Sequence, residues 1–210
     1  FTWRQGPSHI ELSGITFLNA VSKAANFISD GLEVEPEQHV YVNLGNHWQS
    51  PVWCSAVLAT GAVLSDAPAT FNIVNLDEAM PLSNSIVVSR DPFGMPERDL
   101  PESAINASAE VRGFGDYFAP RTATSEETVL TTWGVNVKHA MITVAAMRDE
   151  WGIAETEPIG IALPQNPHMA IEWHSLFGLL NRSPLVLLDS AFEAEQVQTQ
   201  ERIGRIIDLR

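Results

Sequence analysis

The sequence predicts an α/β protein made of two similar modules, each a mostly parallel sheet with flanking helices. Three observations support this fold class. Short β-branched segments alternate with segments of helical periodicity, short loops connect them, and the same order of helix, strand, helix and strand occurs twice in the 210 residues. Because parallel strands need a crossover connection, each strand–helix–strand unit predicts a parallel pair with a right-handed crossover.

The first module begins with a predicted amphipathic helix over residues 14–31. Ser13 is its candidate N-cap and Gly31 its candidate C-cap. The next three elements are a strand, an apolar helix and a strand, expected at 40–44, 48–60 and 62–64. These two strands are therefore expected to be adjacent and parallel in one sheet.

The rest of the first half contains two further strands, a proline-rich loop and a short helix. They are expected at 71–74, 85–88, 90–101 and 102–115. A small N-terminal hairpin is expected from residues 2–4 and 10–12. With this hairpin, the first module covers residues 1–118.

The second module, residues 119–210, repeats the order of the first. Its helix, strand, helix and strand are expected at 133–151, 159–163, 168–180 and 185–188. A helix over 192–209 is expected to close the chain. The repeat predicts a loose internal duplication with a pseudo-two-fold relation, and the alternative is two unrelated units that share a common pattern. The two modules are expected either as separate units or as one compact domain.

Charge and composition exclude several classes of function. The 12 basic and 26 acidic side chains give a net charge of −14 with no basic patch, so we expect no nucleic-acid partner. No run of about 18 apolar residues is present, which predicts no membrane span. The single cysteine, Cys54, cannot form an internal disulfide and lies in an apolar segment. We therefore expect a buried thiol in a cytoplasmic protein.

Candidate pocket residues lie where predicted parallel strands end. His47 and Trp48 follow the first strand of the first module, and His168 and His174 follow the first strand of the second. Ligands of open α/β sheets bind at such carboxyl ends, close to helix N-termini. The alternative for each histidine is a half-buried, hydrogen-bonded imidazole at the start of a helix.

Other site chemistry is not indicated by the residues. His168 and Glu172 share a helical face, but His174 does not, so the three do not predict a zinc site. The sequence has no glycine-rich phosphate fingerprint and no serine nucleophile elbow. We therefore expect no metal and no cofactor, and we assign no catalytic residue.

Several segments resemble acyl-CoA synthetases. Residues 12–64, with Asn26 in the first helix and Asn46-His47-Trp48-Gln49 after the first strand, resemble the opening of that AMP-binding superfamily. Residues 88–96 and 109–118, which read VSRDPFGMP and AEVRGFGDYF, are similar to a family of short bacterial proteins. Those proteins are related to the N-terminal portion of acyl-CoA synthetases and have no assigned activity. The resemblance covers nearly the whole chain and implies the fold of that N-terminal core.

The sequence departs from active members of the superfamily at the phosphate loop. In those members a Ser/Thr/Gly-rich loop that ends in a lysine holds the ATP phosphates. The comparable positions here are Thr124, Ser125, Glu126, Glu127 and Thr128, and no lysine follows until Lys138. Two carboxylates repel a triphosphate rather than bind it. Residues 163–168 resemble the superfamily's Leu-Pro-x-x-His segment near the acyl pocket, with one extra residue before His168.

The resemblance and its departures together predict an acyl-CoA synthetase-like protein that does not adenylate. We expect it to bind a small acyl or nucleotide-like ligand, or to pair with another protein. The alternative is an active acyl-CoA synthetase-like or ligase-like enzyme of unknown reaction, with His47 or His168 as general base. The six tryptophans are more aromatic bulk than a core of this size needs, which predicts a homodimer or a dedicated partner.

Overall fold

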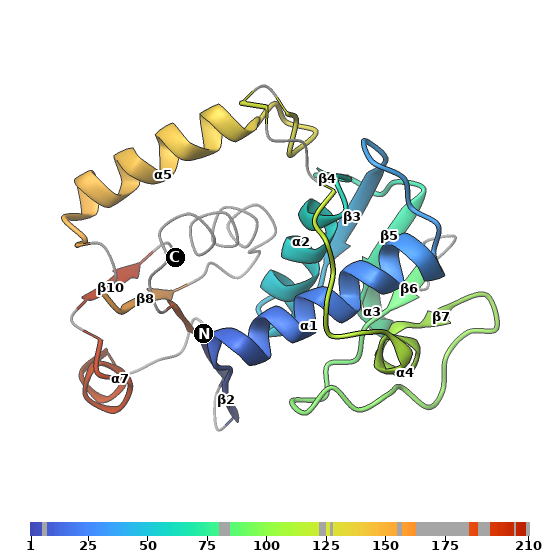
Figure 1. Cartoon of the computed structure of the whole chain (residues 1–210). Helices are drawn as coiled ribbons and strands as arrows, with labels where there is room; N and C mark the ends of the chain where they lie inside the picture. Colours follow the sequence, from blue (N-terminus) through green and yellow to red (C-terminus); the bar gives the residue numbers. More distant parts are fainter. Residues whose placement is uncertain are drawn as a thin grey trace.

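The computed structural model describes residues 1–5, 8–79, 85–121, 125–126, 128–154, 157–162, 185–188, 194–203 and 205–208. Within these residues the chain forms two five-stranded sheets, ordered β4-β3-β5-β6-β7 and β10-β8-β9-β1-β2 (Figure 1). Both sheets are mostly parallel and carry helices, which confirms the predicted α/β class. The predicted division at residue 118 and the predicted duplication stay predictions.

The first sheet is parallel throughout. Its strands are β3 (His39–Asn43), β4 (Val63–Ser65), β5 (Phe71–Val74), β6 (Ser85–Val87) and β7 (Ile105–Asn106). Val40 pairs with Leu64, so the predicted adjacency of the first two strands is confirmed. The opposite edge of β3 pairs with β5, and the chain therefore extends the sheet in both directions from β3.

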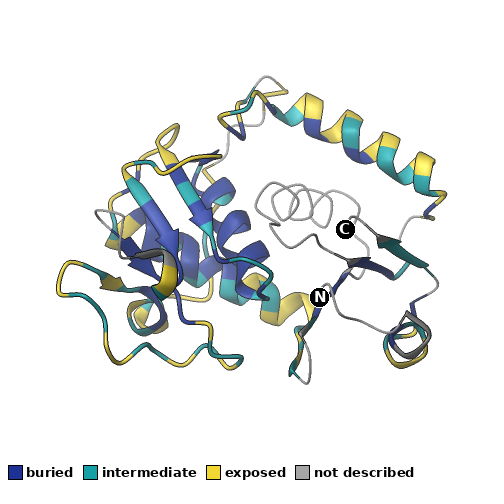
Figure 2. Ribbon diagram, turned by 180° about the vertical axis from the view of Figure 1, so that it is seen from behind, coloured by how far each residue is buried: buried dark blue, intermediate teal, exposed yellow. Residues whose placement is uncertain are grey.

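Helices α1 (Gly14–Asn26) and α2 (Gln49–Ala59) lie side by side on one face of this sheet (Figure 1). All residues of α2 from Gln49 to Leu58 are buried, because α1 and the sheet enclose the helix (Figure 2). An α-helix that is apolar around its circumference is stable only in such a buried place. The core of the molecule therefore centres on α2.

Ser13 caps α1 as predicted, and its Oγ accepts a hydrogen bond from the backbone N–H of Thr16 at 3.1 Å. Beyond Asn26 the helix continues as a π-helix, Phe27–Gly31. Gly31 is not a left-handed cap, because the first positive φ angle, 57°, occurs at Glu33. Gly31 is needed for space instead, since a Cβ atom there would lie 2.9 Å from the ring of Phe114.

The second sheet contains the N-terminal hairpin. Its strands are β1 (Thr2–Gln5), β2 (Ser8–Glu11), β8 (Ile159–Ala162), β9 (Leu185–Leu188) and β10 (Arg205–Asp208). The hairpin itself forms as predicted, with Trp3 opposite Ile10. On its other edge Trp3 pairs in parallel with Leu187, so the hairpin extends the sheet of the second half of the chain.

The predicted closing helix over 192–209 is wrong. Helix α7 (Ala194–Glu201) ends where Arg202 adopts a φ angle of 54°, and β10 then pairs in parallel with β8. The apolar residues of this segment are isoleucines, whose branched Cβ atoms fit a strand better than a helix. Ile203 is buried, and Ile206 lies opposite Gly160. Strand pairing therefore overrides the apparent helical spacing.

Two other predicted helices differ in length from the structure. The helix expected within 102–115 is only α4 (Ala107–Glu110), followed by a 3₁₀ turn, Val111–Gly113. Helix α5 (Val137–Trp151) begins four residues later than predicted and ends, as predicted, at left-handed Gly152. A further short helix, α3 (Leu76–Ala79), follows β5. The helix expected at 168–180 lies outside the described residues.

Candidate functional site

The order of the first sheet creates a switch point at the carboxyl end of β3. Strands β4 and β5 flank β3, so the chain leaves β3 in one direction and later returns on its other side. In open parallel sheets the crevice at such a switch point is the usual ligand site. Three segments meet there, namely 44–48 after β3, 75–77 after β5 and 88–92 after β6.

His47 lies in the first of these segments and is only 5% exposed. Its Nδ1 atom accepts a hydrogen bond from the backbone N–H of Gln49, with the two nitrogens 3.4 Å apart. A neutral imidazole whose Nδ1 accepts carries its proton on Nε2. Nε2 is buried and has no hydrogen-bond partner within the part of the chain that the structure describes. The backbone of Arg90 nevertheless exerts a hydrogen-bond effect on this ring, so its N–H is not isolated from every acceptor.

The surroundings of His47 keep its ring uncharged. Burial, the largest cause, and the nearby positive charge of Arg90 together lower the pKa of His47 from 6.5 to about 4, against smaller raising effects of the Arg90 backbone and the Asp91 carboxylate. Aromatic rings form two of its walls, with the ring centre of Trp3 at 5.0 Å and that of Trp48 at 5.8 Å. The imidazole is therefore neutral at pH 7 and can donate, not accept, through Nε2.

Asn46 connects this loop to the second sheet. Its backbone and side-chain oxygens accept from the indole N–H of Trp3 at 3.2 and 3.3 Å. Its side-chain amide donates to the carbonyl of Leu188 at 2.9 Å. The segment after β3 therefore joins β1 and β9 to the carboxyl edge of the first sheet. This junction makes His47 sit between the two sheets rather than on an open edge.

Charged groups line the outer part of the same edge. The Arg90 guanidinium pairs with Asp77 at 3.1 Å, and both side chains are more than half exposed. An exposed pair of this kind contributes little to stability. Asp77 itself is held because its backbone N–H donates to the side-chain oxygen of Asn75 at 3.1 Å. The edge thus carries both a cation and an anion close to the neutral His47.

Trp48 and Gln49 hold the start of the proline-rich loop. The Trp48 indole donates to the carbonyl of Pro92 at 3.0 Å, and the Gln49 side-chain amide donates to that of Ser89 at 3.1 Å. The carboxylate of Asp91 accepts from the backbone N–H of Phe93 at 2.8 Å. These hydrogen bonds hold the first part of the predicted long loop as a turn.

A pocket of about 170 Å³ lies between α1, α2 and this turn. Its lining combines apolar and aromatic side chains with two cations, and His47 is not part of it. The lining residues are Ala20, Lys23, Ala24, Trp48, Gln49, Val52, Trp53, Phe93, Gly94, Ser108, Val111 and Arg112.

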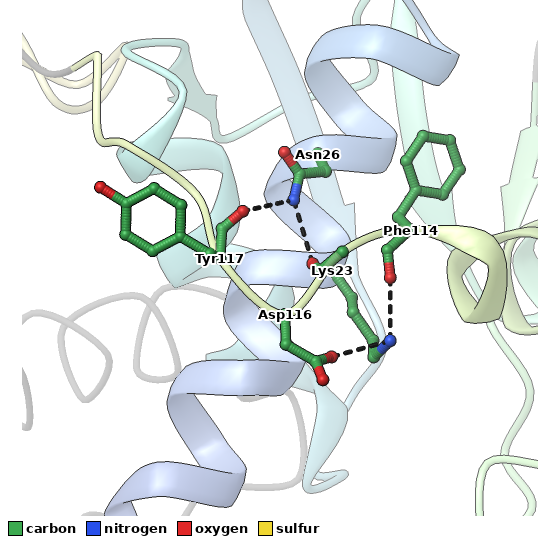
Figure 3. A network of polar contacts seen from close by, with 6 residues as sticks. Lys23, Asn26, Phe114, Asp116 and Tyr117 are labelled. Atoms are coloured by element: carbon green, nitrogen blue, oxygen red, sulfur yellow. Dashed lines mark hydrogen bonds and ion pairs between the residues drawn. The ribbon is translucent and has the colours of Figure 1, made fainter.

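One of the two cations, Lys23, belongs to a polar network that ties α1 to residues 114–117 (Figure 3). Its ammonium group donates to the carbonyl of Phe114 at 2.8 Å and pairs with Asp116 at 2.8 Å. The Asn26 amide donates to the carbonyls of Gly115 and Tyr117 at 3.0 and 2.9 Å. These contacts therefore fix residues 114–117 against α1.

The positions comparable to a phosphate loop lie before α5. Of these, Ser125 and Glu126 are exposed, and the backbone carbonyl of Thr128 accepts from the N–H of Val137 at 3.0 Å. Glu126 accepts from the Lys138 N–H at 2.9 Å, and its carboxylate lies 3.8 Å from the Lys138 ammonium. Thr124 and Glu127 lie outside the described residues. The first lysine after this segment therefore already faces a carboxylate.

The remaining sequence predictions have mixed outcomes. His168 and His174 lie outside the described residues, so their place in a ligand pocket stays a prediction. Cys54 is buried, as expected. In the described ranges, no group of three or more His, Cys, Asp or Glu side chains could hold a metal ion. No helix among these residues is long and apolar enough to cross a membrane.

Sequence reasoning missed most of the polar residues around the candidate site. Asn46, Arg90 and Arg112 entered only as parts of motifs that carry the resemblance, Asp77 did not enter at all, and none was predicted as a site residue, although Asn46, Asp77 and Arg90 follow predicted strands. The signal for those three was their position at carboxyl strand ends, the criterion that selected His47. Arg112 carries no such signal, because only the packing of the 3₁₀ turn against the 93–95 turn places it at the pocket.

Comparison with solved structures defines the class of this fold. A Brucella canis acyl-CoA synthetase superposes with a TM-score of 0.79 and 15% identity over 99% of this chain and 44% of that one. Unliganded o-succinylbenzoate coenzyme A synthetase from Bacillus subtilis gives 0.65 and 11% over 91% and 42%. Coronafacic acid ligase from Pectobacterium brasiliense gives 0.68 and 12% over 99% and 47%. The chain therefore has the fold of the N-terminal part of acyl-CoA synthetases, as its motifs implied.

A particular relative by sequence is the TIGR03089 family protein of Mycobacterium tuberculosis strain H37Rv. The two are 34% identical over 123 residues, which is 53% of this chain and 51% of the relative. The chain thus spans about half the length of the proteins it matches. No protein-family model matches the sequence.

Proposed function

We propose that this chain is an acyl-CoA synthetase-like domain that binds a small ligand at the carboxyl edge of its first sheet and does not adenylate it. The main support for the proposal is the pairing of the lysines with carboxylates. The sequence has two, Lys23 and Lys138, and each lies beside a carboxylate, Asp116 and Glu126 respectively.

Adenylate formation depends almost entirely on positive charge placed around a triphosphate. Here the comparable loop brings Glu126 and Glu127 in place of glycines, and Lys138 is directed to Glu126. The net charge of −14 adds a general repulsion of polyanions. A dissociation constant of even about 1 mM would require roughly 4 kcal/mol of binding free energy. The residues of the comparable loop do not supply the positive charge that this binding free energy requires.

His47 supports ligand binding rather than proton abstraction. A general base works best when its pKa is near the operating pH, whereas the pKa of His47 is lowered to about 4. Its Nδ1 atom is also occupied by the Gln49 N–H. The Nε2–H can instead donate to a carbonyl or carboxylate oxygen of a ligand that takes the place of the Arg90 backbone. This chemistry counts against His47 as the base of an active enzyme, and His168 remains the other candidate for that role.

Calorimetric titration with Mg-ATP tests the proposal. We expect no saturable heat at millimolar nucleotide, since Glu126 and Glu127 stand in the comparable loop and Lys138 lies beside Glu126. The control is a double variant, Thr124→Ala with Ser125→Ala, which removes the hydroxyl groups of the comparable loop. A saturable heat in the native chain that is lost in this variant would show that the loop binds phosphates and would overturn the proposal.

A further inference from the structure

We propose that the pocket between α1, α2 and the Phe93–Gly94 turn is a second binding site, which takes a small monoanion with an apolar body about the size of one aromatic ring. This site is distinct from the carboxyl edge around His47, and it does not depend on the function proposed above. The two sites are separated by the Trp48–Gln49 segment, which contributes to both.

The size and walls of the pocket select the apolar body. Its volume is about 170 Å³, and an apolar protein cavity of about 150 Å³ is known to hold benzene. Ala20 and Ala24 on α1 leave this space open, and Trp48, just before α2, and Trp53, on α2, line its other side. Flat aromatic walls favour a ring or a short branched chain over a polar body.

Arg112 gives the pocket its preference for an anionic ligand. Its Nη2 atom donates to the carbonyl of Gly94 at 3.0 Å and contacts the sulfur of Met95 at 3.6 Å. No carboxylate lies within 4.0 Å of it among the residues that the structure describes. A guanidinium has five N–H donors, so several remain for a ligand. By contrast, Lys23 is already compensated by Asp116.

Arg112 is exposed, so water weakens its attraction for an anion, and the apolar walls beside it must hold the rest of the ligand. The single cation and small volume fit one anionic group, not a di- or triphosphate. A carboxylate can accept two parallel hydrogen bonds from a guanidinium, which adds geometric selectivity. Benzoate has these features and serves as the probe.

The turn beside Arg112 is fixed before any ligand binds. Gly94 has a φ angle of 66°, which favours glycine, and its N–H donates to the carbonyl of Asp91 at 2.9 Å. The Trp48 indole holds Pro92 from the opposite side. Phe93 lines the pocket but is 81% exposed, so a ligand would cover part of its ring. A preformed site loses less entropy on binding.

The experiment compares benzoate with two partial mimics, benzyl alcohol and acetate, on protein labelled with 5-fluorotryptophan. Binding is followed by ¹⁹F NMR at Trp48 and Trp53, assigned with Trp48→Phe. We expect benzoate to shift both resonances with a dissociation constant of about 1 mM or lower. Benzyl alcohol and acetate each lack one recognised feature and should bind at least about tenfold more weakly. Equal affinity for benzyl alcohol, or no shift at 10 mM benzoate, would overturn the proposal.

Three variants separate the charge from the fold. Arg112→Gln should reduce benzoate affinity about tenfold or more while leaving benzyl alcohol unchanged, and Arg112→Lys should recover part of the loss. Ala20→Leu should weaken both ring compounds, because it fills the pocket. Arg98→Gln is the matched control, since Arg98 does not line the pocket. Circular dichroism confirms that each variant is folded. Unchanged benzoate affinity in Arg112→Gln, or an equal loss in Arg98→Gln, would contradict the proposal.

Discussion

The buried imidazole of His47 makes the stability of this chain depend on pH. Its pKa is 6.5 in an unfolded chain and about 4 in the folded one, so between these values the unfolded state binds more protons. The free energy of unfolding should therefore be unaffected by His47 above pH 6.5 and should fall as the pH drops from 6.5 through 4. The full effect is roughly 3 kcal/mol.

Urea unfolding at pH 7.5 and pH 4.5 measures this dependence. His47→Asn is the test variant, because an Asn side chain can still accept the Gln49 N–H but has no titrating ring. The variant should lose about 2–3 kcal/mol less than the native chain between the two pH values. An NMR titration that places the pKa of His47 near 6.5 would contradict this expectation.

The sequence predicted the place of His47 but not its state. Its position after a strand could be derived from the β-branched segment before it, and it is confirmed at the carboxyl end of β3. Its burial could not, because the covering groups, Trp3 and Arg90, come from segments far away in the sequence. Tautomer and pKa depend on those distant contacts and on the Gln49 N–H.

At the scale of elements, Asn46 is the link between the two sheets. Asn46→Ala removes the side-chain acceptor for Trp3 and the donor to Leu188, leaving a buried indole and carbonyl with fewer partners. We expect a loss of about 1–3 kcal/mol in the free energy of unfolding. Asn43→Ala is the matched control, because the side-chain amide of Asn43 donates within its own strand, to the Tyr41 hydroxyl, and does not bridge the sheets among the described residues. An equal and small effect of both changes would show that Asn46 does not join the sheets.

The C-terminal strand can be tested through the glycine opposite it. A Cβ atom at Gly160 would lie 2.6 Å from Ile203 and 3.2 Å from Ile206, because β10 packs against β8. Gly160→Ala should therefore destabilise the chain by about 1–3 kcal/mol. Gly113→Ala, where nothing lies within 4 Å, should be close to neutral. Chemical denaturation compares the two. A neutral Gly160→Ala would indicate that residues 203–208 do not cover β8.

The local sequence pattern was sufficient to predict those elements whose pairing strands are close in sequence. Strands β3 and β4 and the helix between them were predicted, because their pairing follows from one crossover. Strand β10 was mistaken for a helix, since isoleucines at 203, 206 and 207 satisfy a helical spacing as well as a strand. Only the edge of β8, more than 40 residues earlier, decides between the two.

In the whole molecule, the N-terminal hairpin joins the beginning of the chain to the second sheet. Residues 2–5 add β1 to the sheet of β8, β9 and β10, so the first residues of the chain are ordered by some of the last. No local signal reveals this pairing, because the hairpin is complete by itself in sequence. The general fold class and the pairing of β3 with β4 were accessible from the sequence, whereas the joining of the hairpin to the second sheet was not.

Exposed apolar side chains predict that this chain associates with another chain. Large apolar side chains are exposed on two helices, among them Leu18 on α1 and Ile142 on α5, at 61% and 60%. Covering such surface is favourable in water, so we expect a homodimer or a complex with a dedicated partner. For the homodimer, sedimentation at high protein concentration should give about twice the 23.0 kDa of the chain. A species near 23 kDa at all concentrations, with no partner recovered from its source cell, would contradict the prediction.

Pyrophosphate release from Mg-ATP in the presence of a carboxylic acid shows directly whether this chain adenylates. We expect no release above that of a protein-free control across short-chain, branched and aromatic acids, because both lysines of the chain lie beside carboxylates and the comparable loop carries two glutamates. Release that depends on the acid, saturates with ATP and falls in the Thr124→Ala, Ser125→Ala variant would contradict it and identify an active adenylating enzyme.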